Sequence, residues 1–411
     1  MPVPKMDTRD ISRGEFVALV ASYTAINAAA IDVMLPALPF MGEAFQVADA
    51  NDRSLVLTVF LVGLGLPQLI VGPVTDRFGR RAPLLIGLAI YTIAAFAALA
   101  VTSFAALLLL RFAQGVGSAA VAVASQAAVR DRYSGSAMAE VMSLVLSVFM
   151  IVPIVAPFVG QFILLTGPWP LIFVFMGVLG LIFTVWSFVR LPESLRVEDR
   201  RPLQFRPVID GFRIVFSSRA SLAYGVASML MFGSVLGLVN TSQQIYVDVY
   251  GVGALFPLAF GVMPVGFAVA FFVNSRVVMR IGMRRLAHGA MTAFAIVTGL
   301  WLLVGLSTGL PLWLFLTFVA GAALSQGLAW GNIGALVMEP LGEVAGTASA
   351  VFGSVSTVGA ALLAYGIQQS FNGSTTPVIA AFFVFGLGVI GCFLIAERGK
   401  LYAAPPSRDA A

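Results

Sequence analysis

Twelve stretches of this chain are apolar and long enough to cross a lipid bilayer. A transmembrane helix needs about 20 mostly apolar residues. The stretches cover approximately residues 16–40, 53–74, 82–102, 104–128, 138–165, 169–190, 219–246, 253–275, 286–306, 311–336, 346–370 and 376–396. The chain is 59% hydrophobic and only 10% charged, whereas soluble domains are about 25% charged. Because a soluble protein could not bury so much apolar surface, we predict an all-α integral membrane protein.

One long polar interval, "LPESLRVEDRRPLQFRPVIDGFRIVFSS" at 191–218, divides the chain. We expect an N-terminal six-helix bundle (1–190), a linker (191–218) and a C-terminal six-helix bundle with a short tail (219–411). Within the linker, "VIDGFRIVF" (208–216) has the apolar spacing of an amphipathic helix at a membrane surface. The first apolar stretch is longer than the core of a secretory signal and lacks a clear cleavage motif, so we expect a retained membrane helix.

The basic residues are distributed unevenly between the two sides of the membrane. If successive loops alternate in side, all but two of the 24 lysines and arginines lie on the side of the N-terminus. The exceptions are Arg53, in a loop on the opposite side, and Arg111, inside a predicted helix. Basic loops stay in the cytoplasm, so we expect both termini and the linker there. The net charge of +5 then reflects membrane topology, and we expect no nucleic-acid partner.

Several classes of function are disfavoured by what the chain lacks. A single cysteine, Cys392, and a single histidine, His288, give no disulfide framework and no cysteine- or histidine-rich metal site. An intramembrane enzyme would need a nucleophile with its base, or a set of metal ligands, at membrane depth. Transport driven by ATP would need a phosphate-binding loop of the G-x-x-x-x-G-K type, which the sequence does not contain. We therefore predict no enzyme, no metal and no cofactor.

A highly charged turn follows the second apolar stretch of each half. The first reads "GPVTDRFGRR" (72–81), and the loop after the eighth stretch contains "MRIGMRR" (279–285). Met279 stands in the second copy where Asp76 stands in the first. This imperfect sequence repeat predicts two homologous six-helix halves related by a pseudo-twofold axis along the membrane normal.

The first of these loops resembles the signature loop of the major facilitator superfamily. Three further stretches are similar to motifs of its proton-coupled drug exporters: "AAAIDVMLPALPFM" (28–41), "RFAQGVGSAA" (111–120) and "IVPIVAPFVGQF" (151–162), the last with Gln161 in place of a second glycine. Together they look most like the bicyclomycin- and chloramphenicol-resistance branch, the Bcr/CflA-like transporters. "VRDRY", "NSRVVMRIG" and "AGTASA" fit that branch as well. The resemblance covers nearly the whole chain.

The resemblance implies that the signature loop is a conformational gate. Its residues are Gly72, Asp76, Arg77, Gly79, Arg80 and Arg81. Asp76 would pair with a basic group below the fourth helix, for which we choose Arg130, and would face the start of the eleventh helix, whose dipole favours an anion. The alternative is a plain topology signal. That reading accounts for the arginines but not for the aspartate, because acidic residues contribute little to orientation.

Asp32 and Arg111 are predicted to lie near the middle of the membrane. Each is eight residues from the end of its helix, which places it about 12 Å deep in a core with a half-thickness of about 15 Å. We expect an ion pair or a water-bridged pair. Ionisable residues at this depth are functional by default. Burial and Arg111 would act on the proton affinity of Asp32 in opposite directions, so that it could exchange a proton. The alternative is a salt bridge that only fixes the two helices.

Two further groups of residues are candidates. Pro153, Pro157 and Gly160 predict a kinked fifth helix, either as a flexible hinge beside the eighth helix or as a kink that only fits the packing; a bias toward export rests on the resemblance alone. Polar, Met and aromatic side chains on the helices that line the cavity in this family could adapt to varied ligands, but for each of them alone we favour packing or hydrogen bonding between helices. They are Tyr23, Asn27, Met34, Gln126, Met150, Asn240, Gln243, Gln244, Trp330, Asn332 and Phe352. We expect Asn274 to join helices.

These observations favour proton-coupled efflux of small amphipathic drugs by alternating access. The expected location is the bacterial inner membrane, and the expected partners are a small-molecule substrate, protons and lipid. We expect a monomer that is driven by the proton gradient alone. The alternatives are a narrow-substrate metabolite exporter and a proton symporter of the same fold.

Overall fold

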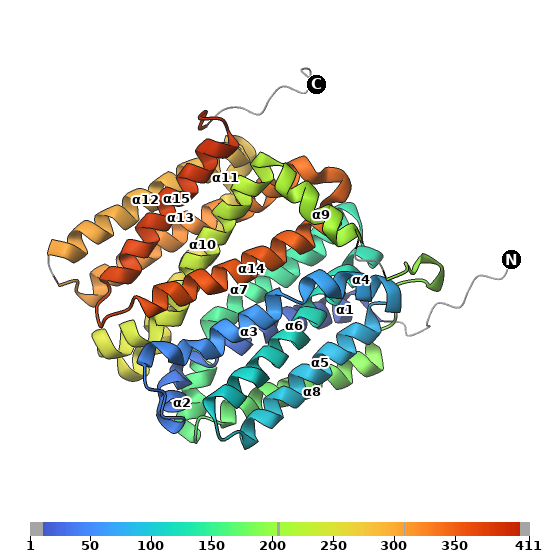
Figure 1. Cartoon of the computed structure of the whole chain (residues 1–411), viewed down its shortest axis with the longest axis horizontal. Coiled ribbons are helices and arrows are strands. Elements are labelled where there is room, and N and C mark those ends of the chain that lie inside the picture. Colours follow the sequence, from blue (N-terminus) through green and yellow to red (C-terminus); the bar gives the residue numbers. More distant parts are fainter. Residues whose placement is uncertain (1–10, 204–205, 308, 403–411) are drawn as a thin grey trace. The chain divides into compact units, whose positions relative to one another are not determined.

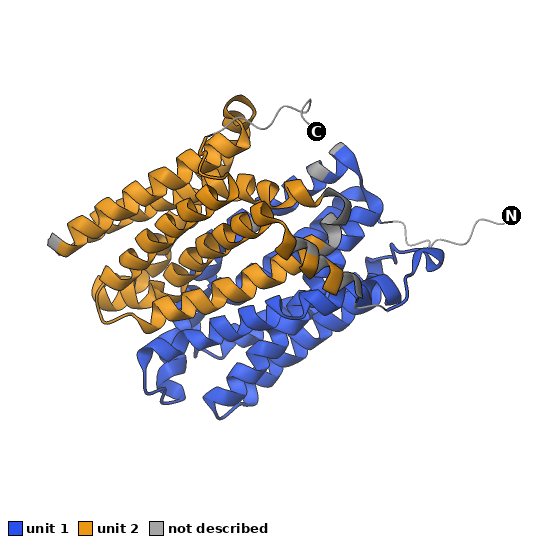
Figure 2. Cartoon of the chain, turned by 45° about the horizontal axis from the view of Figure 1, so that its top comes forward, with its two compact units in different colours: residues 1–208 blue, residues 209–411 orange. Residues whose placement is uncertain are grey.

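A computed structural model of the chain describes residues 11–203, 206–307 and 309–402. All the regular elements in these ranges are helices (Figure 1). The chain divides into two compact units, unit 1 (Met1–Val208) and unit 2 (Ile209–Ala411) (Figure 2). The boundary lies within the interval that we predict to be the linker.

Unit 1 contains six membrane crossings. The first is α1 (Arg13–Asp32), the short turn η1 (Leu35–Ala37) and α2 (Leu38–Ala44), and the second is η2 (Ala50–Ser54), α3 (Leu55–Gly65) and α4 (Gln68–Phe78). The others are α5 (Arg81–Ala97), α6 (Phe104–Arg132), α7 (Gly135–Thr166) and α8 (Leu171–Arg190). Serine residues with extended backbone cap α1 and α6, where Ser12 and Ser103 accept hydrogen bonds from free N–H groups of the first turn.

Unit 2 repeats this order after the linker helix α9 (Arg206–Ser217). Its helices are α10 (Arg219–Gln243), continued by the π-helical turn η5 (Gln244–Val249), α11 (Phe256–Ile281), α12 (Met283–Ser307), α13 (Leu312–Met338), α14 (Ala345–Gln369) and α15 (Thr376–Ala396). The turn η7 (Glu339–Val344) joins α13 to α14. The two charged loops end their helices in the same way, because Gly79 and Gly282 both have a positive φ, at 92° and 86°.

The packing inside the two units follows one plan. In unit 1, α6 packs against α3 and α5, α5 against α8, and α1 against α7 and α8. In unit 2, α13 packs against α11 and α12, α12 against α15, and α10 against α14 and α15. Each pair in the first set corresponds to a pair in the second by its place in the repeat. The predicted fold class, two pseudo-symmetric bundles of six membrane helices, is confirmed.

Eleven helices in the described part of the chain are long and apolar enough to span a membrane, or 12 if the bent pair α3–α4 is one span. The predicted crossings at 16–40 and 53–74 are present, but neither is one regular helix. The first has the turn η1 between α1 and α2, and the second bends by 43° between Gly65 and Gln68. Pro36 and Pro67 lie at these two breaks, where a missing N–H interrupts the helical hydrogen bonds.

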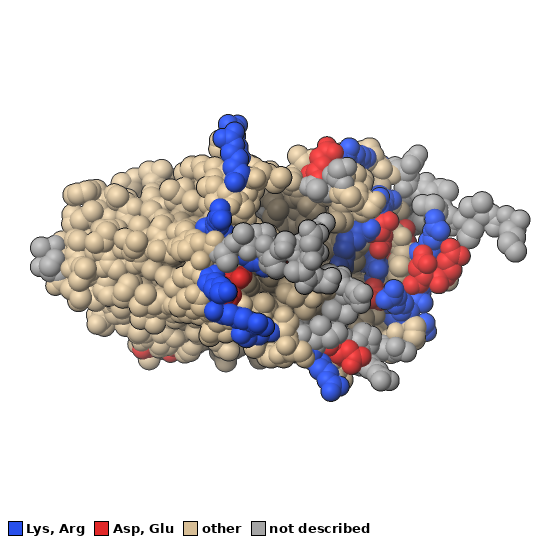
Figure 3. Space-filling view, turned by 90° about the horizontal axis from the view of Figure 1, so that it is seen from above, with Lys and Arg blue, Asp and Glu red and all other residues tan. Residues whose placement is uncertain are grey.

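The surface agrees with a membrane environment. Figure 3 shows lysines and arginines gathered over part of one face, while a long stretch of that face carries neither. Many large apolar side chains are exposed along the helices, among them Ile93, Leu109 and Leu165 at 68–72% exposure. In a soluble monomer such a surface would be an aggregation hazard, but in lipid it is the expected contact.

Candidate functional site

Asp32 is the last residue of α1, where the first crossing is broken. The backbone tightens at this point, so that the Met34 N–H donates to the Ile31 carbonyl at 3.3 Å. In a continuous helix that N–H would have bonded the Ala30 carbonyl. Pro36 has no N–H to continue the pattern. The helix end therefore offers a free backbone carbonyl, that of Ala30, to a partner elsewhere in unit 1.

That partner is Arg111 of α6, which is completely buried. Its Nη2 donates to the Ala30 carbonyl at 2.8 Å, and its Nε donates to the Val56 carbonyl of α3 at 3.1 Å. Its Nη1 donates to Gln114 Oε1 at 2.8 Å. The guanidinium carbon lies 4.5 Å from the centre of the Phe60 ring, a cation–π contact. One side chain thus joins three helices, α1, α3 and α6.

The predicted direct ion pair between Asp32 and Arg111 does not form. The physical reason is that backbone carbonyls and an amide satisfy the guanidinium, so that it needs no carboxylate. Within the ranges that the structure describes, the Asp32 carboxylate has neither a hydrogen bond nor an ion pair, although only 6% of the residue is exposed. An unpaired buried carboxylate is costly, and either a proton or a cation can relieve the cost.

Close backbone contacts hold this arrangement together. A Cβ atom on Gly115 of α6 would overlap the Phe60 carbonyl of α3, and one on Gly63 would overlap the Phe112 carbonyl. A Cβ on Gly160 of α7 would overlap the Val33 carbonyl in the break of the first crossing. Helices in membranes use small residues to approach so closely. The glycines therefore fix the distances over which Arg111 acts.

Replacing Gly160 by alanine should destabilise unit 1 by about 1–3 kcal/mol, because the new methyl group meets backbone that cannot rotate away. The matched control is Gly366→Ala in α14, where a Cβ would meet nothing within 4 Å. There alanine should be neutral or stabilise the helix by about 0.5–1 kcal/mol. Thermal unfolding of the two purified variants tests the difference, and equal melting temperatures would contradict the close contact.

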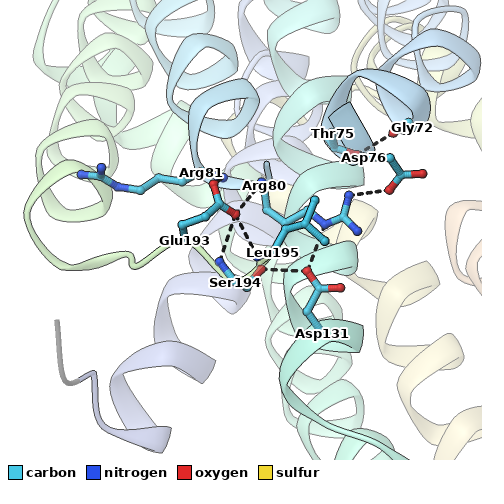
Figure 4. A network of polar contacts seen from close by, with 9 residues as sticks. All are labelled: Gly72, Thr75, Asp76, Arg80, Arg81, Asp131, Glu193, Ser194 and Leu195. Atoms are coloured by element: carbon cyan, nitrogen blue, oxygen red, sulfur yellow. Dashed lines mark hydrogen bonds and ion pairs between the residues drawn. The ribbon is translucent and has the colours of Figure 1, made fainter. Parts of the chain in front are cut away.

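The signature loop forms a network of polar contacts at one end of unit 1 (Figure 4). Arg80 Nη1 pairs with Asp76 Oδ1 at 2.5 Å, and Arg80 Nε pairs with Asp131 Oδ2, at the end of α6, at 3.0 Å. The Arg80 side chain is only 10% exposed. Burial alone would lower the pKa of Arg80, but hydrogen bonds and charges from Asp131 and Asp76 outweigh burial and raise it. Arg80 is therefore a fixed cation between two carboxylates.

Glu193, just after α8, completes this network (Figure 4). Its carboxylate accepts from the backbone N–H groups of Arg80 at 2.8 Å and Arg81 at 3.3 Å, which begin α5. It also accepts from the N–H groups of Ser194 and Leu195, both at 3.0 Å. An anion at a helix N-terminus satisfies free donors and favours the helix dipole. The charged loop is thus tied to α6 and to the first residues after α8.

The structure corrects the predicted partner of Asp76. Arg80, four residues along the same loop, occupies the position that we assigned to Arg130, because the start of α5 turns its side chain back toward Asp76. Arg130 is exposed on α6. Arg77 is also exposed, whereas the Gly72 carbonyl accepts from the Thr75 hydroxyl at 2.7 Å inside α4.

Unit 2 has a related cluster without the aspartate. Arg284 Nη2 pairs with Glu339 at 2.7 Å and Arg284 Nε with Glu397 at 2.9 Å. These acids follow α13 and α15, as Asp131 and Glu193 end α6 and follow α8 in unit 1. Met279, the counterpart of Asp76, is exposed. The second copy therefore also has arginine–carboxylate contacts, but through Arg284, which lies two residues after Gly282, whereas Arg80 directly follows Gly79, and it lacks the acid of the loop.

The remaining candidates of unit 1 have different surroundings. Pro153 and Pro157 lie inside α7, which runs unbroken through both. Tyr23 is buried, and its hydroxyl lies 2.6 Å from the Ser187 hydroxyl of α8, so it joins two helices. The side-chain oxygen of Asn27 is buried and has no hydrogen-bond partner within the described part of the chain. Of the others, Met34 is buried, Met150 is half-buried and Gln126 is exposed.

The candidates of unit 2 are amides and aromatic rings. Asn332 Nδ2 donates to Asn274 Oδ1 at 2.8 Å, which joins α13 to α11 as expected for Asn274. Gln244 Oε1 accepts from Gln368 Nε2 at 3.0 Å. Trp330 packs edge-to-face on Phe232 and Phe267, with ring centres 5.6 and 6.0 Å away. Asn240 and Gln243 are buried, and Phe352 lies beside Gly225.

Sequence reasoning missed Gln114, Asp131, Glu193 and Glu397 as members of these clusters. Gln114 stood in a quoted motif, three residues after Arg111, a spacing that puts the two on one helix face. The acids at 193 and 397 each follow a membrane helix directly. That position is a usable signal, because a carboxylate there can reach the start of a neighbouring helix.

Two repeated six-helix units, with an ionisable residue at a broken helix in one of them, define a secondary transporter. The family model described as "Major Facilitator Superfamily" matches residues 20–364, and the chain belongs to this superfamily. Its members are transporters, not enzymes.

The relatives of this chain include proteins named for drug resistance. A bicyclomycin resistance protein homolog of Haemophilus influenzae is 28% identical over 326 residues, 79% of this chain and 81% of that protein. A chloramphenicol resistance protein of Pseudomonas aeruginosa is 30% identical over 348 residues, 82% of this chain and 79% of that protein. The crystal structure of a D-xylose–proton symporter shares the fold, with a TM-score of 0.72, 16% identity and coverage of 95% of this chain and 99% of that one.

Proposed function

We propose that this transporter exports small amphipathic drugs or related compounds in exchange for protons. The observation that carries the proposal is the buried Asp32 carboxylate at the break of the first crossing, which has no hydrogen-bond or ion-pair partner among the residues that the structure describes. A proton entering from one side and a cationic or polar substrate from the other would compete for this group. The resistance proteins named above support the substrate class.

In this mechanism Arg111 is a positioning residue. Its bonds to the Ala30 and Val56 carbonyls hold the end of α1 against α3 and α6, and so fix the place of Asp32. Proton binding or release at Asp32 then changes the charge beside a permanent cation. The amides and aromatic rings of unit 2, together with Asn27, Met34, Gln126 and Met150, supply candidate contacts for the substrate.

The Asp76–Arg80–Asp131 contacts serve as the gate of unit 1. Rearranging them would break two ion pairs in one step, which gives the loop two discrete arrangements. Pro153, Pro157 and Gly160 in α7 are the proposed hinge. We place the protein in a bacterial inner membrane with both termini in the cytoplasm, because nearly all the basic residues lie on that side. We propose that it works as a monomer without a cofactor.

Everted membrane vesicles that contain the protein test this function. Their interior is acidified, and the collapse of the pH gradient is followed as cationic dyes, fluoroquinolones and chloramphenicol are added in turn. At least one compound should release protons from these vesicles and not from vesicles that lack the protein. A chain that responds to none of them would instead be a narrow-substrate metabolite exporter or a symporter.

A further inference from the structure

The only histidine of the chain, His288, lies under a turn that follows the last membrane helix. We call residues 398–402 the C-terminal strap. The Tyr402 N–H donates to His288 Nδ1 at 3.2 Å, and the Tyr402 hydroxyl lies 2.8 Å from the Thr292 hydroxyl one turn further along α12. The Tyr402 carbonyl accepts from Arg285 Nε at 3.3 Å. His288 is 1% exposed, so the strap covers it.

These contacts determine which nitrogen of the imidazole carries the proton. A backbone N–H can only donate, so Nδ1 must be unprotonated while the Tyr402 contact exists. Nε2 then carries the hydrogen and lies 3.1 Å from the Tyr224 hydroxyl of α10. That hydroxyl donates in turn to Glu397 Oε1 at 2.6 Å. The strap therefore binds the neutral form of His288 and not the imidazolium, whose Nδ1–H would face another N–H.

The strap is also held in an unfavourable backbone conformation. Tyr402 has φ = 64° and Arg398 has φ = 52°, in the left-handed region that side chains other than glycine rarely adopt. Such residues cost about 1–3 kcal/mol each and persist only where the surroundings enforce them. For Tyr402 the enforcing contacts are the hydrogen bonds to α12 and the edge-on packing against the imidazole, with ring centres 5.8 Å apart. Losing the hydrogen bond to His288 removes one of these contacts, so that less opposes the strain.

We propose that His288 is a pH-sensitive latch for the C-terminal strap, closed while the imidazole is neutral and opened when it takes up a proton. The pH that matters is that on the side of the membrane holding the termini. Strap binding requires the neutral form, so binding is complete at higher pH and is lost as the pH falls. The latch would free the start of α12 from the tail.

The other charged groups around His288 have partners of their own. Burial alone would raise the pKa of Glu397, but hydrogen bonds from Tyr224 and Arg284 outweigh burial and lower it, so that Glu397 stays ionised. Arg284 pairs with Glu397 and Glu339, and Arg285 donates to the Tyr402 carbonyl. Phe393 supplies only an aromatic face, 4.7 Å from the imidazole centre. His288 is therefore the side chain whose protonation acts directly on the Tyr402 N–H.

Hydrogen exchange of the full-length protein in detergent tests the latch. Exchange rates of the peptide that contains the Tyr402 amide are divided by the intrinsic rates at pH 7.5 and at pH 5.5. Protection of the strap should fall about tenfold at the lower pH, the equivalent of one hydrogen bond. Protection elsewhere in unit 2 should stay constant. Unchanged protection of the strap in the wild type would overturn the proposal without the need for any variant.

Two variants separate the effect of the hydrogen-bond acceptor, His288 Nδ1, from that of the imidazolium charge. His288→Asn places a side-chain oxygen near the position of Nδ1 and cannot titrate, so the strap should be protected equally at both pH values. His288→Phe keeps a ring and removes the acceptor, so the strap should be unprotected at both. A Phe variant with wild-type protection and wild-type pH dependence would show that Arg285 and Thr292 hold the strap and that His288 does not.

Discussion

Asp32→Asn should abolish drug-dependent proton release while leaving the fold intact. The amide has nearly the shape of the carboxyl group but cannot carry a proton. Because the Asp32 carboxylate has no hydrogen-bond or ion-pair partner in the described ranges, its replacement breaks no contact. The response of everted vesicles to any active compound should fall to that of vesicles without the protein. The melting temperature of unit 1 should change by less than about 2–4 °C, the equivalent of about 1 kcal/mol in a unit of about 200 residues.

Two controls make this prediction sharp. Asp32→Glu keeps a titratable group one methylene further out, so it should retain some proton release with an altered pH dependence. Asp210→Asn changes a carboxylate on the linker helix α9, which the mechanism does not use, and should leave the response at the wild-type level. Proton release by Asp32→Asn at the wild-type rate would show that another group carries the proton, and the proposed mechanism would fail.

Arg111→Leu, unlike Asp32→Asn, should destabilise the fold. The change leaves the Ala30 carbonyl and Gln114 Oε1 without the donor that Arg111 supplies, and removes the second donor of the Val56 carbonyl, which keeps its helical one inside α3. Each buried acceptor without a partner costs about 1–3 kcal/mol. The cation–π contact with Phe60 contributes up to about 2 kcal/mol more when desolvated. We expect a loss of at least about 3 kcal/mol, seen as a large drop in melting temperature and in the yield of folded protein.

Arg111→Lys separates charge from geometry. A lysine keeps the positive charge, but its donors all leave one nitrogen and cannot reach three acceptors arranged around a planar guanidinium. Its stability should lie between those of the wild type and Arg111→Leu. Arg213→Ala, on the exposed face of α9, controls for the loss of an arginine as such and should be neutral. If Arg111→Lys were as stable as the wild type, the positive charge alone would account for the stability. The hydrogen bonds from the guanidinium to the Ala30 and Val56 carbonyls would then not be needed.

Much of the fold could be read from hydropathy. In a membrane, every backbone group must be satisfied inside its own segment or by a close neighbour, so a long apolar stretch has few alternatives to a helix. The depth of Asp32 and Arg111 in the membrane stays a prediction from counting residues, and the structure shows that both are buried. The breaks were harder to place. Pro36 and Pro67 were visible, but membrane helices tolerate proline, and sequence alone does not separate a kink from a break.

The partners of Arg111 could not have been read from sequence. Two of them are backbone carbonyls, which every residue possesses, and one is available only because α1 unwinds at Met34. Pairing Arg111 with Asp32 was the natural expectation because side-chain charge is what a sequence displays. Asp76 was paired with the wrong arginine for a related reason. The turn at Gly79 brings Arg80 back beside Asp76, and a turn of this kind is a property of φ rather than of residue type.

The bend between α3 and α4 allows the two halves of the second crossing to move separately. The helix α4 has 11 residues and is therefore about 16 Å long. A rotation of α4 by about 10° at the bend would displace its far end by about 3 Å, comparable to the length of one hydrogen bond. The helix α3, in which Arg111 contacts Val56 and Phe60, would not need to move. The charged loop would then change its position while α3 stays bound to α6.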